Sequence, residues 1–163
     1  MTERDVPAVV AACQDPEIPR WTTVPTPYRR EHALSWHMVQ EAKRRAGEAI
    51  FLIVADAQSD ELLGAIDVRV TSADQRRGEI GYWLAAPARG RGAMTRALVL
   101  LSRWAFAGVG LGRIEVLAHP DNAASQRVAE RAGFVREGLM RDYALRRGQR
   151  EDMLLYSLVA GDV

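Results

Sequence analysis

The sequence is poor in the residues from which covalent crosslinks and metal clusters are built. Its 163 residues include one cysteine, Cys13, and three histidines, His32, His37 and His119. A single cysteine excludes a disulfide within the chain and a cysteine-based metal cluster, and it is typical of proteins in a reducing cytosol. The histidines have no metal-ligand spacing with carboxylates, so we expect no metal site.

The chain also lacks an excess of charge of one sign and a long apolar run. The formal net charge is +1, so no global field indicates nucleic acid or an anionic membrane as a partner. No apolar run reaches the length that spans a bilayer, and the start MTERDVPAVV has no apolar signal-peptide core. We therefore expect a cytoplasmic protein. The hydrophobic share of 48% is enough for one globular domain over residues 1–163.

The first part of the chain predicts two helices joined by a loop. Thr2 and Asp5 form a capping box that opens a short helix ending near Cys13. The four prolines of DPEIPRWTTVPTPY then exclude regular helix and central strand. A second helix is predicted from about residue 30 to residue 46, with Gly47 as its stop.

From residue 50 the hydrophobic period changes and predicts a sheet. Three strands form an antiparallel meander, and helices separate the third, fourth and fifth strands. The strands are predicted near 50–56, 62–71, 79–85, 113–119, 134–145 and 151–159, and the helices near 91–107 and 122–132. The predicted fold class is therefore α+β, with a mixed sheet covered by helices.

The segment PARGRGAM, residues 87–94, places two glycines and two arginines between a strand and a helix. A glycine-rich loop at a helix start presents unpaired N–H groups beside the positive end of the helix dipole, which suits a phosphate. Gly90 and Gly92 would admit the ligand to the backbone, and Arg89 and Arg91 would add charge-assisted hydrogen bonds.

Other interpretations of this segment fit the residues less well. A Walker loop needs Gly-Lys-Ser or Gly-Lys-Thr, which is absent here. A dinucleotide fingerprint needs a third glycine where Thr95 stands, within a parallel βαβ unit. An ordinary turn with solvated arginines stays open.

Two long segments resemble the GNAT acyltransferase superfamily, and within it the branch of ribosomal-protein N-terminal (Rim-type) acetyltransferases. GEIGYWLAAPARGRGAMTRALVLLSRWAF resembles the acyl-CoA motif of that branch, and HPDNAASQRVAERAGFVREGLMRD its second motif. The first motif reads Arg89, Gly90, Arg91, Gly92, Ala93, Met94, with Met94 where a small residue is usual. The second motif includes Asn122, Ser125, Gly133 and Phe134, and DPEIPRW resembles the acceptor-side loop.

The resemblance implies a fold. GNAT proteins have a mixed, mostly antiparallel sheet with splayed central strands and helices on both faces. They usually begin with a strand, whereas this chain starts at its first helix, so the usual first edge strand is expected to be absent. The strand near 50–56 would then form an exposed edge, which the partner subunit of a homodimer would cover.

The resemblance also implies a reaction. An acyl group, in the first place acetyl, would pass from acyl-CoA to a primary amine by direct attack, without a metal. The amine would belong to a protein N-terminus or a small molecule. The pantetheine arm would pair with backbone groups of Trp83, Leu84 and Ala85 and touch Asn122, and the pyrophosphate would lie on the amides of residues 89–94.

Two side chains are candidates for catalysis and two for the acceptor pocket. Glu79 would act as the base on the incoming ammonium, or else be a solvated strand carboxylate. Ser125 would protonate or hydrogen-bond the leaving thiolate, or else help Asn122 to cap its helix. Trp21 and Tyr143 are predicted walls of the acceptor pocket.

Two further functional hypotheses stay open. A GNAT-like domain could bind or sense acyl-CoA without turnover, which is favoured if Glu79 and Ser125 both prove irrelevant. A nucleotide-binding regulatory domain would require ATP or NAD to compete at the glycine turn.

Overall fold

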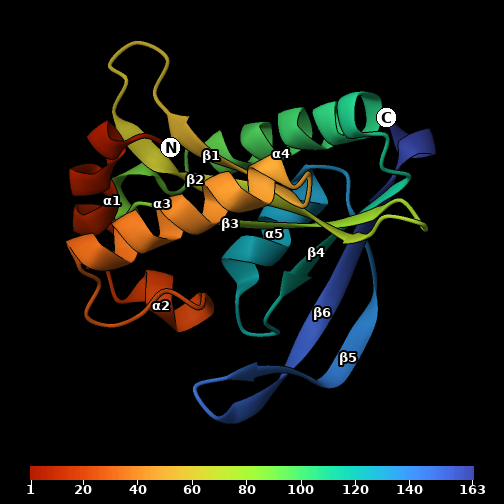
Figure 1. Ribbon diagram of the computed structural model, residues 1–163. Helices are drawn as coiled ribbons and strands as arrows, with labels where there is room; N and C mark the ends of the chain where they lie inside the picture. Colours follow the sequence, from red (N-terminus) through yellow and green to blue (C-terminus); the bar gives the residue numbers. More distant parts are fainter. The chain divides into compact units, whose positions relative to one another are not determined.

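The computed structural model describes residues 1–163 and follows the predicted order of elements, with one helix added. Helices are α1 (Val6–Ala12), α2 (Glu17–Trp21), α3 (Arg30–Arg45), α4 (Ala93–Trp104) and α5 (Ala123–Arg131). Strands are β1 (Ala49–Ala55), β2 (Leu62–Ser72), β3 (Arg77–Leu84), β4 (Arg113–Ala118), β5 (Val135–Arg146) and β6 (Gln149–Val159). Figure 1 shows these elements along the chain.

The strands pair in the order β1-β2-β3-β4-β6-β5, so β1 is an edge strand, as predicted for residues 50–56. The chain divides into two compact units, and β2 and β3 contribute residues to both. Unit 1 consists of Met1–Asp67 and Tyr82–Met94, and unit 2 of Val68–Gly81 and Thr95–Val163. The single domain over residues 1–163 stays a prediction.

In unit 1 the first helices begin and end as predicted. The backbone N–H of Thr2 donates to Asp5 Oδ2 at 2.6 Å, which confirms the capping box. Helix α3 ends just before Gly47, whose φ of +71° is the left-handed conformation that closes many helices. The ring of Trp36 on α3 meets Phe51 on β1 edge to face, with centroids 5.8 Å apart.

The prediction of no regular helix among the four prolines was wrong, because α2 lies there. Pro16 occupies the N-cap position of α2, and Pro19 lies in its first turn. The N–H groups of a first turn have no intrahelical partner, so a proline there removes no hydrogen bond. Ile18 of α2, 3% exposed, anchors the helix in the core of unit 1.

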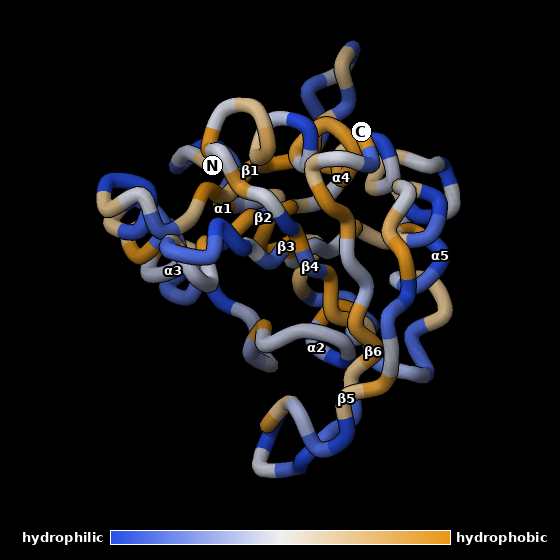
Figure 2. Tube along the Cα trace, turned by 90° about the vertical axis from the view of Figure 1, so that its right-hand side faces the viewer, coloured by the Kyte–Doolittle hydropathy of each residue, from blue (hydrophilic) through white to orange (hydrophobic).

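The core of unit 1 forms between the short helices and the first strands. Its buried members are Val6, Val9, Cys13, Ile18, Tyr28 and Ala33, and partly buried side chains, among them Trp83 at the end of β3, pack against them. Figure 2, coloured by residue hydropathy, shows more apolar residues along β1 and β2 than along α3. A Cβ atom at Gly64 of β2 would lie 2.2 Å from the Trp83 carbonyl oxygen, so this close approach requires glycine.

In unit 2 the two central strands pair only briefly. Strands β3 and β4 are parallel, and their ladder consists of Arg77 with Arg113, Gly78 with Ile114 and Glu79 with Glu115. Both strands continue beyond this ladder, β4 as far as Ala118, where it still pairs with β6. The parallel ladder is therefore short, and the splay of the central strands stays a prediction.

The remaining strands of unit 2 are antiparallel. Strand β6 pairs with β4 on one side and with β5 on the other. Alternate residues of β4 are buried, Ile114, Val116 and Ala118, and with Ile80 of β3 and Tyr156 of β6 they contribute to the core. None of the helices in the structure combines the length and the apolar character that a membrane-spanning helix requires.

Candidate functional site

The glycine-arginine turn, residues 89–92, has a backbone conformation that glycine alone adopts readily. Gly90 and Gly92 have φ angles of +76° and +73°, in the left-handed region. A Cβ atom at Gly90 would meet no atom within 4 Å, so the conformation and not crowding selects glycine there. Helix α4 begins directly afterwards, at Ala93 and Met94, and both side chains are buried. Met94 therefore directs its larger side chain into the protein, although a small residue is usual at this position.

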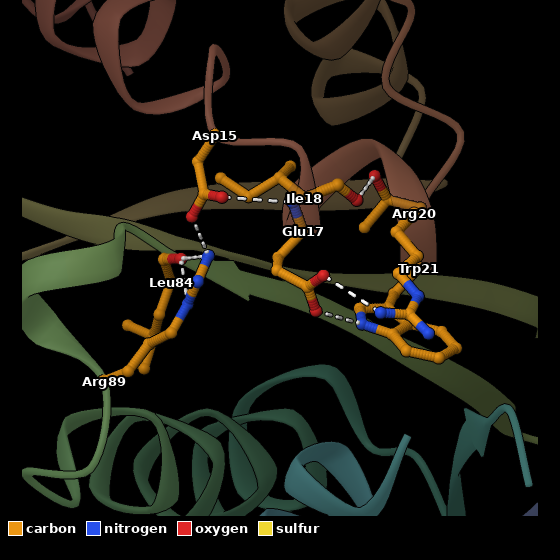
Figure 3. A network of polar contacts seen from close by, with 8 residues as sticks. Asp15, Glu17, Ile18, Arg20, Trp21, Leu84 and Arg89 are labelled. Atoms are coloured by element: carbon orange, nitrogen blue, oxygen red, sulfur yellow. Dashed lines mark hydrogen bonds and ion pairs between the residues drawn. The ribbon is translucent and has the colours of Figure 1, made fainter. Parts of the chain in front are cut away.

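The side chain of Arg89 makes contacts inside unit 1 (Figure 3). Its Nε and Nη2 atoms donate to the Leu84 carbonyl oxygen at 3.2 and 3.0 Å. Its Nη2 atom also lies 2.5 Å from Asp15 Oδ2, in an ion pair whose side chains are 38% and 20% exposed. The structure thus brings together Arg89 and Leu84, both predicted to contact the cofactor, and pairs them with each other.

A neighbouring backbone group in this region is also engaged. The N–H of Ala85 donates to the Leu63 carbonyl oxygen at 2.9 Å. Cofactor contacts of Trp83, Leu84 and Ala85 stay predictions. A pantetheine arm would have to use groups other than the Leu84 carbonyl and the Ala85 amide, or displace these bonds.

Asp15 and Glu17 are polar residues of unit 1 that the sequence analysis missed. Asp15 Oδ1 accepts the N–H of Glu17 at 3.0 Å, at the start of α2. The Glu17 carboxylate accepts hydrogen bonds from Trp21 Nε1 and Arg20 Nη1, each at 3.1 Å. The Arg20 guanidinium also lies 4.5 Å from the centre of the Trp21 ring. These hydrogen bonds, first from Trp21 and then from Arg20, lower the pKa of Glu17. The predicted acceptor wall Trp21 is therefore held in place by its own helix.

One signal in the sequence could have identified the pair of Glu17 and Trp21. The two residues are four positions apart, the spacing of neighbours on one helix face. The prolines concealed the helix, and with it the spacing. No signal in the sequence indicates the contact of Asp15 with Arg89, because both residues lie in loops.

In unit 2 the predicted base Glu79 is an ion-paired strand residue. Its Oε1 lies 2.7 Å from Nη2 of Arg69 on β2, and the Glu79 side chain is 23% exposed. The register pairs Glu79 with Glu115 on β4. Paired residues of adjacent strands point to the same face, so Glu79 and Glu115 share a charged face.

The same face of unit 2 carries a second ionic network. Arg113 donates through Nε to Glu115 at 2.8 Å and through both Nη atoms to Glu137 at 2.7 Å. Ser157 Oγ donates to the same Glu137 carboxylate at 2.5 Å. The hydrogen bonds from Arg113, and then that from Ser157, lower the pKa of Glu137 to about 2. The ion pair with Arg69 shows that Glu79 is a paired carboxylate and not a solvated one, and its role as the base stays a prediction.

The second motif lies at the start of α5, where two predicted residues meet. Asn122 Oδ1 accepts the N–H of Ser125 at 3.0 Å, which confirms Asn122 as the N-cap. Ser125 is partly buried in the first turn. Ala129, at the position where many superfamily members carry tyrosine, is 0% exposed. A tyrosine there would need space that the core does not offer.

The predicted acceptor wall Tyr143 belongs to the hairpin of β5 and β6, in unit 2. Its side chain is 52% exposed. It lies where the register of the two strands shifts, between Met140 and Ala144, and it follows Asp142, whose φ is +58°. The irregular strand presents Tyr143 at the surface of the hairpin.

Comparisons with known proteins bear on the whole chain. Residues 1–135 match the family described as "Acetyltransferase (GNAT) domain". "Uncharacterized N-acetyltransferase YoaA" of Bacillus subtilis is 27% identical over 159 residues, which are 98% of this chain and 90% of that protein. "Ribosomal-protein-serine acetyltransferase" of Escherichia coli is 32% identical over 103 residues, 63% of this chain and 57% of that protein.

A solved structure extends the comparison to the fold. Mycobacterium smegmatis RimJ in complex with CoA-disulfide matches with a TM-score of 0.86 at 27% identity, over 100% of this chain and 81% of that one. The predicted fold class, a mixed and mostly antiparallel sheet with helices, is confirmed by this match and by the strand order.

Proposed function

The chain belongs to the GNAT acetyltransferase family, and from that premise we propose that it transfers an acetyl group from acetyl-CoA to a primary amine by direct attack. The family match over residues 1–135 carries this conclusion. The left-handed conformations of Gly90 and Gly92, at the turn that resembles the acyl-CoA motif, support it.

The pyrophosphate of the cofactor is proposed to lie on the amides at the start of α4. The first N–H groups of a helix have no intrahelical partner and lie at the positive end of its dipole. The turn of Gly90 and Gly92 would bring the backbone of Arg91, Ala93 and Met94 close to the phosphate oxygens. Asn122 is proposed to contact the pantetheine arm while it caps α5.

The chemical steps need two groups of this chain. The attacking amine must lose a proton, and Glu79 is proposed to accept it directly or through a water molecule. The carbonyl carbon of the acetyl group then bonds to nitrogen, and the carbon–sulfur bond breaks. Ser125 is proposed to donate a proton or a hydrogen bond to the sulfur as negative charge develops on it.

The acceptor is proposed to be an amine at a protein N-terminus, with a small-molecule amine as the second candidate. The Escherichia coli relative is described as acting on a ribosomal protein, which makes ribosomal N-terminal peptides the first acceptors to test. Trp21 and Tyr143 are proposed as walls that contact the acceptor. The edge strand β1 supports a homodimer in which a second subunit covers it, measurable by sedimentation.

The experiment that tests this function starts from the wild-type chain. Acetyl-CoA or CoA should raise the melting temperature, as a ligand of the native state must, while ATP and NAD should not. A screen of N-terminal peptides and small amines, with release of CoA thiol as readout, should then return an acceptor. Binding without turnover on any amine would favour a silent acyl-CoA sensor. Equal stabilisation by ATP would favour the regulatory alternative.

A further inference from the structure

We propose that Arg89 is a positioning residue: through Asp15 it holds α2, which carries Trp21, against the end of β3. Affinity for the amine acceptor would then depend on Arg89, a residue of the glycine-arginine turn. The effect on the acceptor rests on the proposed function, whereas the mechanical link does not. The link lies wholly within unit 1 (Figure 3).

The contacts of Arg89 connect two parts of the chain that are far apart in sequence. The guanidinium donates to the carbonyl of Leu84, the last residue of β3, and forms an ion pair with Asp15. The Asp15 side chain is only 20% exposed. Removal of either charge leaves the other partly buried without its partner, which destabilises the local structure more than loss of an exposed pair would.

Asp15 passes this connection on to α2. Its Oδ2 atom meets Arg89, and its Oδ1 atom accepts the N–H of Glu17, the first residue of the helix. The Glu17 carboxylate in turn holds the indole of Trp21. The Asp15 carboxylate therefore links the guanidinium of Arg89 to α2, the helix that carries the proposed acceptor wall Trp21.

Helix α2 depends on such anchors because it is short. It has five residues, too few to be helical in isolation. Its anchors are the buried side chain of Ile18 and the Asp15 carboxylate at its start. Loss of the carboxylate anchor is therefore expected to let α2 open locally while the rest of unit 1 stays folded.

A phosphate ligand is the alternative role for Arg89, and the two roles differ in the sign of one effect. If the guanidinium bound phosphate, Asp15 would compete with the cofactor for it. Asp15→Asn would then raise CoA affinity, whereas Arg89→Ala would lower it. If Arg89 positions α2, Asp15→Asn and Arg89→Ala should have the same consequence, because both break the same link.

The first test measures hydrogen exchange of residues 15–22 in the chain without any ligand. Arg89→Ala and Asp15→Asn should each speed amide exchange in this segment roughly fivefold, the upper end of what loss of an ion pair at a partly exposed site produces. The double variant should exceed neither single variant, since the two residues share one interaction. Arg91→Ala, in the same turn, is the matched control and should leave the segment unchanged.

The second test measures the Kd for CoA and the KM for the amine returned by the acceptor screen. Arg89→Ala and Asp15→Asn should raise the acceptor KM several-fold, roughly in proportion to the loosening of α2, and leave the CoA Kd within about threefold. Wild-type exchange of residues 15–22 in Arg89→Ala would overturn the proposal, and so would tighter CoA binding in Asp15→Asn. A wild-type chain without turnover would overturn the proposed function, while the exchange result would still decide the link.

Discussion

Arg89 in unit 1 and Arg113 in unit 2 are both engaged by carboxylates, but they reach their partners in different ways. Arg113 lies on β4, and Glu137 and Ser157 lie on the strands next in order, β5 and β6. The partners of Arg89 are the carbonyl of Leu84 and the carboxylate of Asp15, in a loop far earlier in the sequence. The strand order of the sheet brings the first set of partners together, with Glu137 at a register shift of β5, whereas a contact between two loops brings the second set together.

The difference teaches how an arginine in a ligand-binding motif should be interpreted. In the sheet of unit 2, acidic and basic residues on neighbouring strands neutralise each other, so their charges do not indicate a ligand. The glycine turn has no acidic residue nearby in sequence, which made its arginines appear available to a phosphate. Asp15 supplies that acidic residue, so the carboxylate partners of an arginine need to be known before the arginine is assigned to a ligand.

The largest expected effect separates Glu79 from the other paired carboxylates of unit 2. Glu79→Gln should lower turnover by roughly 10²-fold near neutral pH, since a general base contributes about 10² to 10⁴. Raising the pH should recover part of the loss, because more of the amine is then neutral. Steady-state acetyl transfer from about pH 6.5 to 9.5 measures both effects.

Two control variants make this result specific. Arg69→Gln removes the ion-pair partner and keeps the carboxylate, so it should retain most of the activity. Glu137→Gln alters a carboxylate without a proposed chemical role and should retain it too. If Arg69→Gln lost as much activity as Glu79→Gln, the ion pair and not the base would be the requirement.

The second prediction concerns the glycine turn of unit 1. Gly92→Val places a β-branched side chain where the pyrophosphate should approach, so CoA affinity should fall by at least about tenfold, or about 1.4 kcal/mol. Gly148→Val is the matched control, since Gly148 has a φ of +78° and open space around it. Titration calorimetry on both folded variants should show the loss of affinity for Gly92→Val only; normal CoA binding there would place the phosphate elsewhere.

The third prediction distinguishes capping from chemistry at α5. Asn122 caps the helix through the backbone N–H of Ser125, which Ser125→Ala retains. The variant should therefore fold normally and bind CoA within a few-fold of wild type. If the hydroxyl assists the leaving thiolate, kcat should fall by roughly fivefold, as for loss of one hydrogen bond that strengthens with charge, and alkali should not restore it. An unchanged kcat would assign Ser125 to the helix alone.

The smallest effect tests the sheet network through the pH dependence of stability. The folded pKa of Glu137 is about 2, below its ordinary value of 4.5. A lowered pKa stabilises the fold above the unfolded value, and this contribution is lost as the pH falls from about 4.5 through about 2. Because the carboxylate is 40% exposed, the contribution should be at most about 1 kcal/mol. Urea unfolding at several pH values should show this slope in wild type and a smaller one in Glu137→Gln.

The regular parts of the fold were predictable from sequence because their signals are local. Hydrophobic period, the Thr2–Asp5 capping box, Gly47 and Asn122 indicated the strands and the helix ends to within a few residues. The use of glycine at positions 90 and 92 was inferred from a glycine-rich loop that leads into a helix, and their left-handed φ angles agree with it. Helix α2 was missed because prolines usually interrupt helices, although Pro16 and Pro19 occupy positions that tolerate them.

The contacts of the candidate site were harder to predict. The ion pair of Arg69 with Glu79 depends on strand register, which the sequence left open. The pair of Arg89 with Asp15 depends on how two loops meet in unit 1. Propensity and periodicity carry information over one or two turns of chain, and neither extends to such distances.

Cys13 gives the chain a practical advantage in the laboratory. Its side chain is buried in unit 1, and burial raises its pKa to about 12. Disulfide reagents react with thiolates, so a folded molecule contributes almost no colour of its own to an assay that detects released CoA. A slow signal that approaches one equivalent per chain would report unfolding of unit 1, and the same cuvette would record turnover and denaturation as two separable phases.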